Sequence, residues 1–188
     1  MAVPALRTWV PGDLATSTLL NAQIRDVVKY QMGTLATGKP LGCFNKTATQ
    51  SISNDTWETV TWNQNIKAPT EGTSFHSIVS STDLVTIQTA GLYDVRVQTY
   101  WAADADGRRA TRIQKNSATI VHAGVNSAGC TPDGDAWTGN SSQTAYDLSM
   151  MTVLAATDVL RVQVWHTAGA ALNLQAASWF SVRWVAAS

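Results

Sequence analysis

The strongest pattern of apolar and polar positions in this chain lies within residues 89–101. Tyr93, Val95 and Val97 alternate there with charged and amide side chains, a period of two residues that predicts a β-strand with one buried face. Gly91 gives the strand a flexible entry because it accepts backbone angles that other residues avoid. A strand buries its apolar face only against other elements, so this pattern predicts a sheet organised around the segment.

Two later segments, residues 159–165 and 179–185, alternate in the same way and predict partner strands. In the second segment Phe180 and Val182 fall on one face and polar side chains fall on the other. The residues predicted for the core of the head domain are Tyr93, Val95, Val97, Phe180 and Val182.

Shorter apolar runs punctuated by turn residues fill the rest of the chain after Met32. They predict further strands at residues 41–52, 57–66, 75–80, 84–88, 109–115, 118–122, 144–153 and 172–176. A long polar, glycine-rich segment, residues 123–142, separates two of them. About ten short strands without helical periodicity indicate a mainly β protein, an antiparallel jelly-roll β-sandwich.

The N-terminal region has a different pattern. Residues 1–15 contain prolines and an isolated Trp9 and predict an extended arm. Leu20, Ile24 and Val27 then recur at helical spacing, which predicts one short α-helix that Gly33 ends. This helix either docks or trimerises the protein, or packs on its own domain. The predicted organisation is an arm and helix at 1–32, a linker at 33–40 and a head domain at 41–188.

Charged residues make up only 14% of the chain, against a usual share of about 25%, and the formal net charge is zero. A low-charge surface suits a subunit of an assembly. Without excess positive charge the chain lacks the attraction that drives binding to nucleic acid or anionic membranes, so neither is an expected partner. With no signal-peptide pattern and only two cysteines, Cys43 and Cys130, we expect synthesis in a cytoplasm and two free thiols.

Residues with the spacing of an active site or metal site do not stand out. His76, His122 and His166 lie on different predicted strands without ligand spacing beside them. The Asp-Gly segments at 104–107 and 133–135 are typical of turns and lack the ligand set of an EF-hand. We therefore expect no catalytic residue, no cofactor and no metal, and a wall hydrolase is the least favoured class.

Four short motifs recur along the head domain: Gly91-x-Tyr93-x-Val95, Ile113 to Asn116, Leu154 to Leu160, and Ser178 to Phe180. In order and spacing they resemble the jelly roll shared by the complement globular head and tumour necrosis factor. Two residues, Ser117 and Thr157, stand where this superfamily prefers glycine. The resemblance implies a homotrimer packed around a three-fold axis by aromatic and apolar residues.

The opening segment resembles that of many tail and virion proteins of phages of Gram-positive and actinobacterial hosts. Its pattern is Thr8-Trp9-x-x-Gly12, Leu20-Asn21, Ile24-Arg25-Asp26 and Tyr30. The resemblance implies a non-enzymatic virion structural protein, assembled in the host cytoplasm, that contacts other virion proteins through this segment. It would project its head as a capsid decoration or a tail-tip or fibre component. The residues expected to dock or trimerise are Trp9, Leu20, Ile24 and Val27.

An alternative function keeps the same fold. The head would be a receptor-binding module for host attachment that recognises a host cell-wall carbohydrate. Trp137, in the polar segment 123–142, is then the expected sugar contact because an exposed indole can stack on a sugar ring. A packing role for Trp137, at the end of the sandwich or in the trimer interface, is the competing interpretation.

Overall fold

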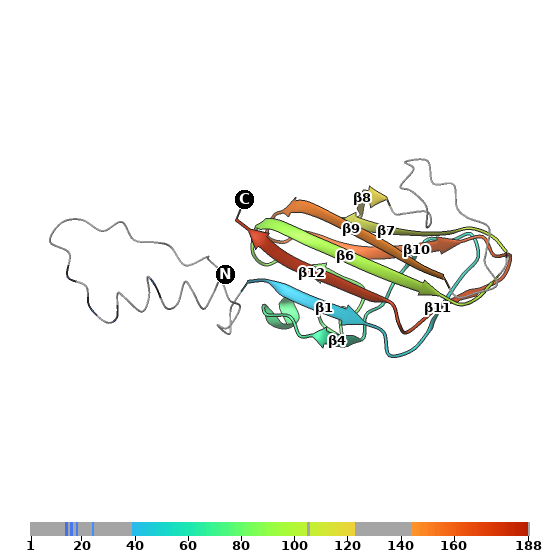
Figure 1. Ribbon diagram of the computed structural model, residues 1–188, viewed down its shortest axis with the longest axis horizontal. Coiled ribbons are helices and arrows are strands. Elements are labelled where there is room, and N and C mark those ends of the chain that lie inside the picture. Colours follow the sequence, from blue (N-terminus) through green and yellow to red (C-terminus); the bar gives the residue numbers. More distant parts are fainter. Residues whose placement is uncertain are drawn as a thin grey trace.

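The structure is a computed structural model that describes residues 39–104, 106–122 and 144–187, with four single positions, Leu14, Thr16, Thr18 and Ile24, before them (Figure 1). Within these residues there is no helix long and apolar enough to cross a membrane. The predicted arm, docking helix and most of the linker lie outside the described residues, as does the polar segment 123–142.

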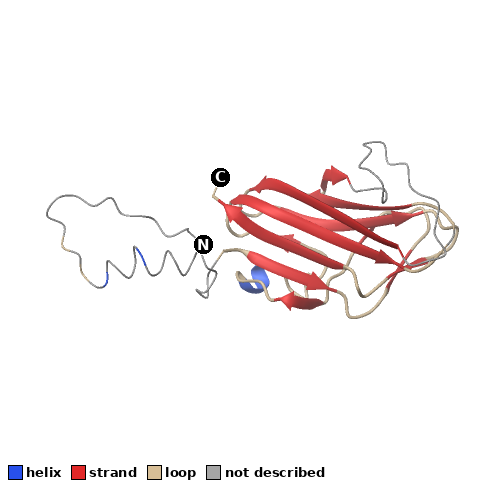
Figure 2. Ribbon diagram, viewed as in Figure 1, coloured by secondary structure: helices blue, strands red, loops and turns tan. Residues whose placement is uncertain are grey.

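The head is an antiparallel β-sandwich, which confirms the predicted fold class (Figure 2). Sheet A contains seven strands in the order β2-β11-β6-β12-β1-β4, with β9 paired to β6, and sheet B contains five in the order β3-β10-β7-β8, with β5 paired to β10. The strands of the described residues are β1 (Leu41–Asn45), β2 (Gln50–Ile52), β3 (Glu58–Thr59), β4 (Gln64–Lys67), β5 (Val85–Thr86), β6 (Gly91–Trp101), β7 (Arg109–Lys115), β8 (Ala118–His122), β9 (Thr144–Leu154), β10 (Val159–His166), β11 (Leu172–Leu174) and β12 (Trp179–Ala186).

Strand β6 is central to sheet A, with β12 on one side and β9 on the other. The five side chains predicted for the core lie between the two sheets, each with at most 1% of its surface exposed. They pack with the inward side chains of β7 and β10, such as Ile113 and Val162. Strand β1 begins and β12 ends at the same end of the sandwich (Figure 1).

The glycine and tyrosine that open β6 have a packing role. A Cβ added at Gly91 would lie 2.2 Å from Trp184 Nε1, so only glycine lets this indole cross the start of the strand. The Tyr93 hydroxyl donates a hydrogen bond to the carbonyl oxygen of Thr89 at 2.6 Å and fixes the turn that enters β6. The Gly-x-Tyr motif therefore builds the fold rather than a binding site.

Two other motifs, 42 residues apart, meet in one clamp. Asn116 Nδ2 donates to Asp158 Oδ1 at 2.7 Å, and the Val159 N–H donates back to Asn116 Oδ1 at 2.8 Å. Ser117 and Thr157, the two residues that replace glycine, have φ angles of 68° and 75°, in the left-handed region that favours glycine. Both turns therefore hold a residue with a side chain in a backbone conformation that glycine adopts more easily.

Two of the predicted strands are divided. Residues 41–52 form β1 and β2 with Lys46 between them, and the Lys46 ammonium is buried against Gln50 Oε1 and the Thr61 carbonyl oxygen, both at 2.8 Å. Residues 57–66 start in sheet B as β3 and continue in sheet A as β4. Val60 and Trp62, between these two strands, are fully buried, whereas Thr61 and Asn63 are exposed, so the chain passes from one sheet to the other along the edge of the core.

The predicted strand at 75–80 is wrong. A 3-10 turn, η2 (Gly72–Ser74), precedes it, and Ser77 Oγ accepts hydrogen bonds from the N–H groups of Val79 and Ser80. A serine that bonds the following backbone N–H groups favours a turn over a strand. The neighbouring predicted strand, residues 84–88, is shorter in the structure, where only β5 is a strand.

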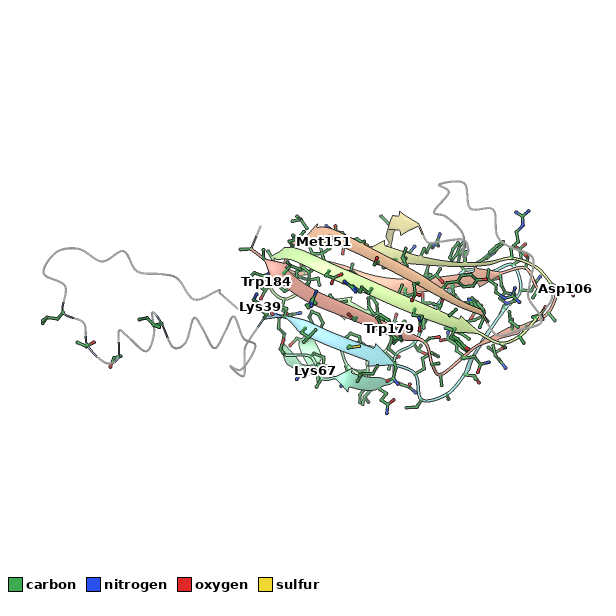
Figure 3. The ribbon with its side chains drawn as sticks, viewed as in Figure 1. Lys39, Lys67, Asp106, Met151, Trp179 and Trp184 are labelled. Atoms are coloured by element: carbon green, nitrogen blue, oxygen red, sulfur yellow. The ribbon has the colours of Figure 1, made fainter. Side chains whose placement is uncertain are left out.

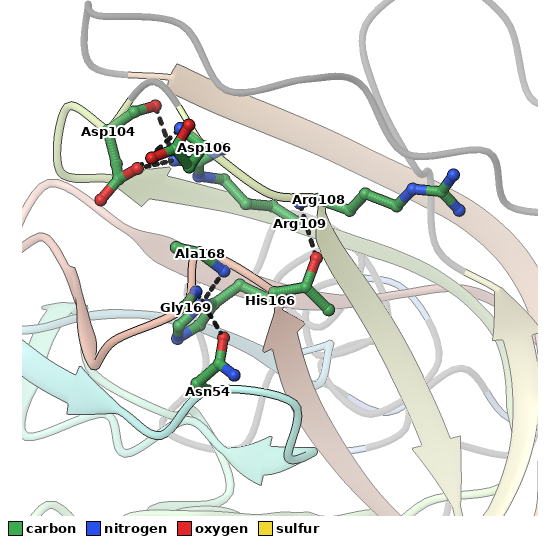
Figure 4. A network of polar contacts seen from close by, with 9 residues as sticks. Asn54, Asp104, Asp106, Arg108, Arg109, His166, Ala168 and Gly169 are labelled. Carbon is green, nitrogen blue, oxygen red and sulfur yellow. Dashed lines mark hydrogen bonds and ion pairs between the residues drawn. The ribbon is translucent and has the colours of Figure 1, made fainter.

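At the end of the sandwich away from the start of β1, three turns are tied together (Figure 4). Arg108 and Thr167 exchange hydrogen bonds, the Gly169 N–H donates to Asn54 Oδ1 at 2.8 Å, and Asp104 Oδ1 accepts from the Asp106 N–H at 2.8 Å. The predicted Asp-Gly turn at 104–107 is thus part of a structural network, in which the Asp104 carboxylate holds its own loop.

Candidate interaction surface on sheet A

The outer face of sheet A carries an ion cluster built from neighbouring strands. Asp94 on β6 lies opposite Arg183 on β12, and its carboxylate oxygens contact Arg96 Nε at 3.0 Å and Arg183 Nη2 at 2.9 Å. The hydrogen bond from Arg96 holds the pKa of the Asp94 carboxyl below its ordinary value, and the charges of both arginines act in the same direction against the effect of burial. Asp94 is 89 residues from Arg183 in sequence, so only the pairing of β6 with β12 reveals the cluster.

A depression of about 360 Å³ opens beside these three charged residues. Its lining is completed by Ser149, Met150 and Met151 from β9 and by Val185 from β12. The depression therefore combines a paired carboxylate, a hydroxyl group and apolar side chains, and its floor is the sheet itself.

The strand β9 leaves apolar surface in water next to the depression. Met151 and Val153 are 60% and 56% exposed, and both point away from the core (Figure 3 labels Met151). Within the described residues this strand of eleven residues pairs with β6 alone, so its other edge is open. Long open edges with apolar side chains are where proteins pair with further chains.

Trp179 lies on the same face, half-buried on β12, and its indole Nε1 donates to Gln98 Oε1 at 3.1 Å (Figure 3). Together the surface offers aromatic and aliphatic groups and a carboxylate paired with two arginines, a cluster with a net charge of one positive unit. Such a mixture is typical of protein interfaces, where charged residues are sparse unless paired.

The two histidines whose side chains the structure describes, His76 and His166, are each held by hydrogen bonds to the backbone. His166 is buried and its ring nitrogens are both used, Nε2 by the Ile52 carbonyl oxygen at 2.9 Å and Nδ1 by the Ala168 N–H at 3.2 Å (Figure 4). His76 lies elsewhere in the core, between the carbonyl oxygens of Leu84 and Trp62. In the described part of the chain no three His, Cys, Asp or Glu side chains gather where they would hold a metal ion.

The basic run at 108–112 is divided among different surroundings. Arg109 is buried and its Nη2 donates to the Asp104 carbonyl oxygen at 2.9 Å, whereas Arg112, on the same strand β7, lies over the Trp57 ring at 4.0 Å on the outer face of sheet B. These side chains therefore do not form one basic patch.

Of the residues predicted to dock or trimerise, Ile24 is 58% exposed, and Trp9, Leu20 and Val27 lie outside the described residues. Trp137 and Cys130 also lie outside them, while Cys43 on β1 carries a free thiol.

The outer face of sheet A was not predicted to be an interaction surface. The sequence of β9 could have indicated this surface, because Met151 and Val153 occupy outward positions where a half-buried strand usually has polar residues.

No protein-family model matches the chain, and no curated protein matches it. Among solved structures it is similar to the globular domain of zebrafish complement 1qA protein, with 14% identity, a TM-score of 0.53, and coverage of 80% of this chain and 100% of that one. It is also similar to Eiger TNF from S. frugiperda (16% identity, TM-score 0.50, 80% and 95% coverage) and to murine APRIL at pH 5.0 (12%, 0.52, 78% and 99%). These similarities establish a TNF-like jelly roll and confirm the resemblance read from the motifs.

Proposed function

We propose that this chain is a non-enzymatic homotrimeric head that assembles through the outer face of sheet A. The observation that carries the proposal is the pair of exposed side chains, Met151 and Val153, on an open edge strand beside the ion cluster of Asp94 with two arginines. Burial of this surface by a neighbouring copy removes apolar area from water, which stabilises association by roughly 25 cal/mol per Å² before the entropic costs of binding.

A closed ring of identical subunits satisfies every copy of such a surface. The TNF-like fold supports three as the number of copies, because members of this superfamily are typically trimers. The low share of charged residues, 14%, supports the same proposal, since an assembled subunit exposes less of its surface to solvent.

Light scattering coupled to size exclusion tests the assembly. The full chain is expected at about three times 20.2 kDa. The double substitution Met151→Asp with Val153→Asp should yield smaller species that remain folded, because both side chains are exposed and contribute little to the core. Val79→Asp is the matched control, since Val79 is 86% exposed but lies in the turn after η2, away from β9, and should leave the mass unchanged.

Two results would contradict the proposal. The unmutated protein would run as a monomer at micromolar concentration, or the β9 double variant would keep the mass of the unmutated protein. A mass of twice 20.2 kDa that falls to 20.2 kDa in the variant would keep the surface but replace the trimer by a dimer.

For the biological setting we propose a phage particle, with the N-terminal segment as the anchor and other virion proteins as its partners. The support is the residue pattern of that segment, together with a head whose first strand begins only at Leu41. Immunoblotting of purified particles and of the lysate supernatant tests the proposal. The protein should copurify with particles, and its absence from them would overturn the virion role while leaving the assembly proposal intact.

A further inference from the structure

Two tryptophans lie side by side on the outer face of sheet B. Trp57 precedes β3 and Trp165 is on β10, and these strands pair with Glu58 opposite Val164. The two ring centroids are 6.2 Å apart with an angle of 27° between the planes, and both side chains are half-buried. The face therefore presents a pair of nearly parallel indoles to solvent, on the side of the sandwich opposite the Asp94 cluster.

A continuous chain of hydrogen bonds holds the polar side chains beside these rings. Arg112 lies on Trp57, and its Nε and Nη2 donate to Gln163 Oε1 at 2.9 and 2.6 Å. Gln163 Nε2 donates onward to Thr59 Oγ1 at 3.2 Å. Groups fixed in this way lose little conformational entropy when a partner binds, which is the advantage of a preorganised site.

The remaining hydrogen-bonding capacity points outward. A guanidinium group has five N–H donors, and the described contacts of Arg112 use two of its nitrogen atoms. The Trp165 indole N–H donates to Asp55 Oδ1 at 3.1 Å, and this carboxylate can accept further hydrogen bonds. Donors and acceptors therefore flank an aromatic surface.

Charges on this face are balanced. Arg161 is paired with Asp83 at 3.4 Å, and Arg112 and Asp55 bring one charge of each sign to the two tryptophans. A balanced surface gives no net attraction for a polyanion such as a nucleic acid. Its chemistry suits a neutral partner with many hydroxyl groups.

We propose that the outer face of sheet B is a binding site for a neutral oligosaccharide. The exposed surface of the Trp165 indole packs against the apolar face of a pyranose ring, Trp57 with Arg112 over its ring supports that indole, and Arg112, Gln163 and Asp55 bond the hydroxyl groups of the sugar. Binding sites generally combine aromatic surface with a few well-placed polar groups in this way. The site shares no residue with the surface on sheet A, so it does not depend on the assembly proposed above.

A protein partner fits this face less well. The cores of protein interfaces are apolar and depleted of charged residues. Here the neighbours of the two tryptophans are threonine, glutamine and arginine, whereas exposed aliphatic side chains lie on β9 of sheet A. The two faces of the sandwich therefore offer different chemistry, and the polar one matches a sugar.

Isothermal titration of the full chain with neutral hexasaccharides of N-acetylglucosamine, glucose, mannose and galactose tests the site. At least one probe should bind in the millimolar range or tighter. Trp165→Ala should weaken that binding at least about tenfold, the usual effect of losing a central aromatic contact. The control is Val79→Ala, which removes an exposed side chain from the turn after η2 and should leave the affinity unchanged.

If Trp165→Ala does not fold, Gln163→Ala is the variant to test. It should weaken sugar binding because it removes the hydrogen bonds that hold Arg112 in place. The proposal is overturned if none of the four probes binds at millimolar concentration, if polygalacturonate binds and the neutral probes do not, or if the Trp165 and Val79 substitutions have equal effects. Light scattering on the same samples shows whether a loss of sugar binding comes from a loss of assembly. Trp165→Ala should weaken sugar binding and leave the oligomeric mass unchanged.

Discussion

Replacement of Thr157 by glycine should stabilise this protein, although it removes a side chain. Thr157 has a φ of 75°, and the left-handed conformation costs an L-residue roughly 1–2 kcal/mol, with β-branched residues among the least tolerated there. Its side chain is exposed. Its backbone N–H donates to the Ile87 carbonyl oxygen at 2.7 Å, a bond that glycine keeps.

Part of the stabilisation from relieving this strain is lost, because glycine makes the unfolded chain more flexible, which lowers the free energy of unfolding by about 0.5–1 kcal/mol. The net increase in the free energy of unfolding should therefore be about 0.5–1 kcal/mol, which corresponds to a rise of about 1–4 °C in Tm for a domain of this size. Urea unfolding and calorimetry at equal protein concentration measure it, since an oligomer's Tm depends on concentration.

Ala156→Gly is the matched control for this experiment. Ala156 is the adjacent residue in the same turn, it is also exposed, and its φ is not positive. Glycine at this position should therefore lower the free energy of unfolding by about 0.5–1 kcal/mol, because there is no left-handed strain to relieve and only the entropic cost remains. Equal losses in both variants would refute the reasoning, since the left-handed strain at Thr157 would then contribute nothing.

Three further predictions concern other parts of the head. Gly107→Ala should lower the free energy of unfolding by more than about 2 kcal/mol, because its φ is 72° and a Cβ would lie 2.0 Å from the Thr167 carbonyl oxygen. Gly169→Ala is the control, since Gly169 has a φ of 86° but open space around it, and it should lower the free energy of unfolding by only about 1 kcal/mol. Urea titrations measure both variants, and equal effects would contradict the steric argument. Burial lowers the pKa of Lys46 from 10.5 to about 8, so between these pH values the unfolded chain binds more protons than the folded chain. The free energy of unfolding should therefore rise with pH across that window by up to roughly 3 kcal/mol. Lys46→Met should remove this rise, and a variant with the pH profile of the unmutated protein would contradict the prediction. Deletion of residues 1–32 should leave the head folded by circular dichroism but absent from purified particles, whereas an unfolded product would place the N-terminal helix in the head's own core.

The period-two alternation was enough to place the sheet and much of its core. Tyr93, Val95 and Val97 could be assigned to one face because side chains of a strand alternate strictly and only one set was apolar. Phe180 and Val182 follow from the same rule. Local turn chemistry likewise placed the turns at Asn54 and Asn116, since these signals are carried by a few adjacent residues.

Alternation alone did not show where a strand changes partners. Residues 57–66 alternate throughout, yet the chain leaves sheet B after Thr59 and joins sheet A at Gln64. Val60 and Trp62 would be buried as inward positions of one continuous strand, and they are buried equally where the chain passes between the sheets along the edge of the core. The pattern therefore predicts burial correctly without showing the break.

Both candidate surfaces were decided by the tertiary structure. The contact between Asp94 and Arg183 and the pairing of Trp57 with Trp165 each join residues far apart in sequence, and they exist only in one strand order and register. A register shift of one residue would turn each of these side chains to the other face of its sheet. The sequence determined which positions of each strand are buried and where several turns fall, because those signals are local. The sheet order decided which outward side chains meet, because it sets the pairing between distant strands.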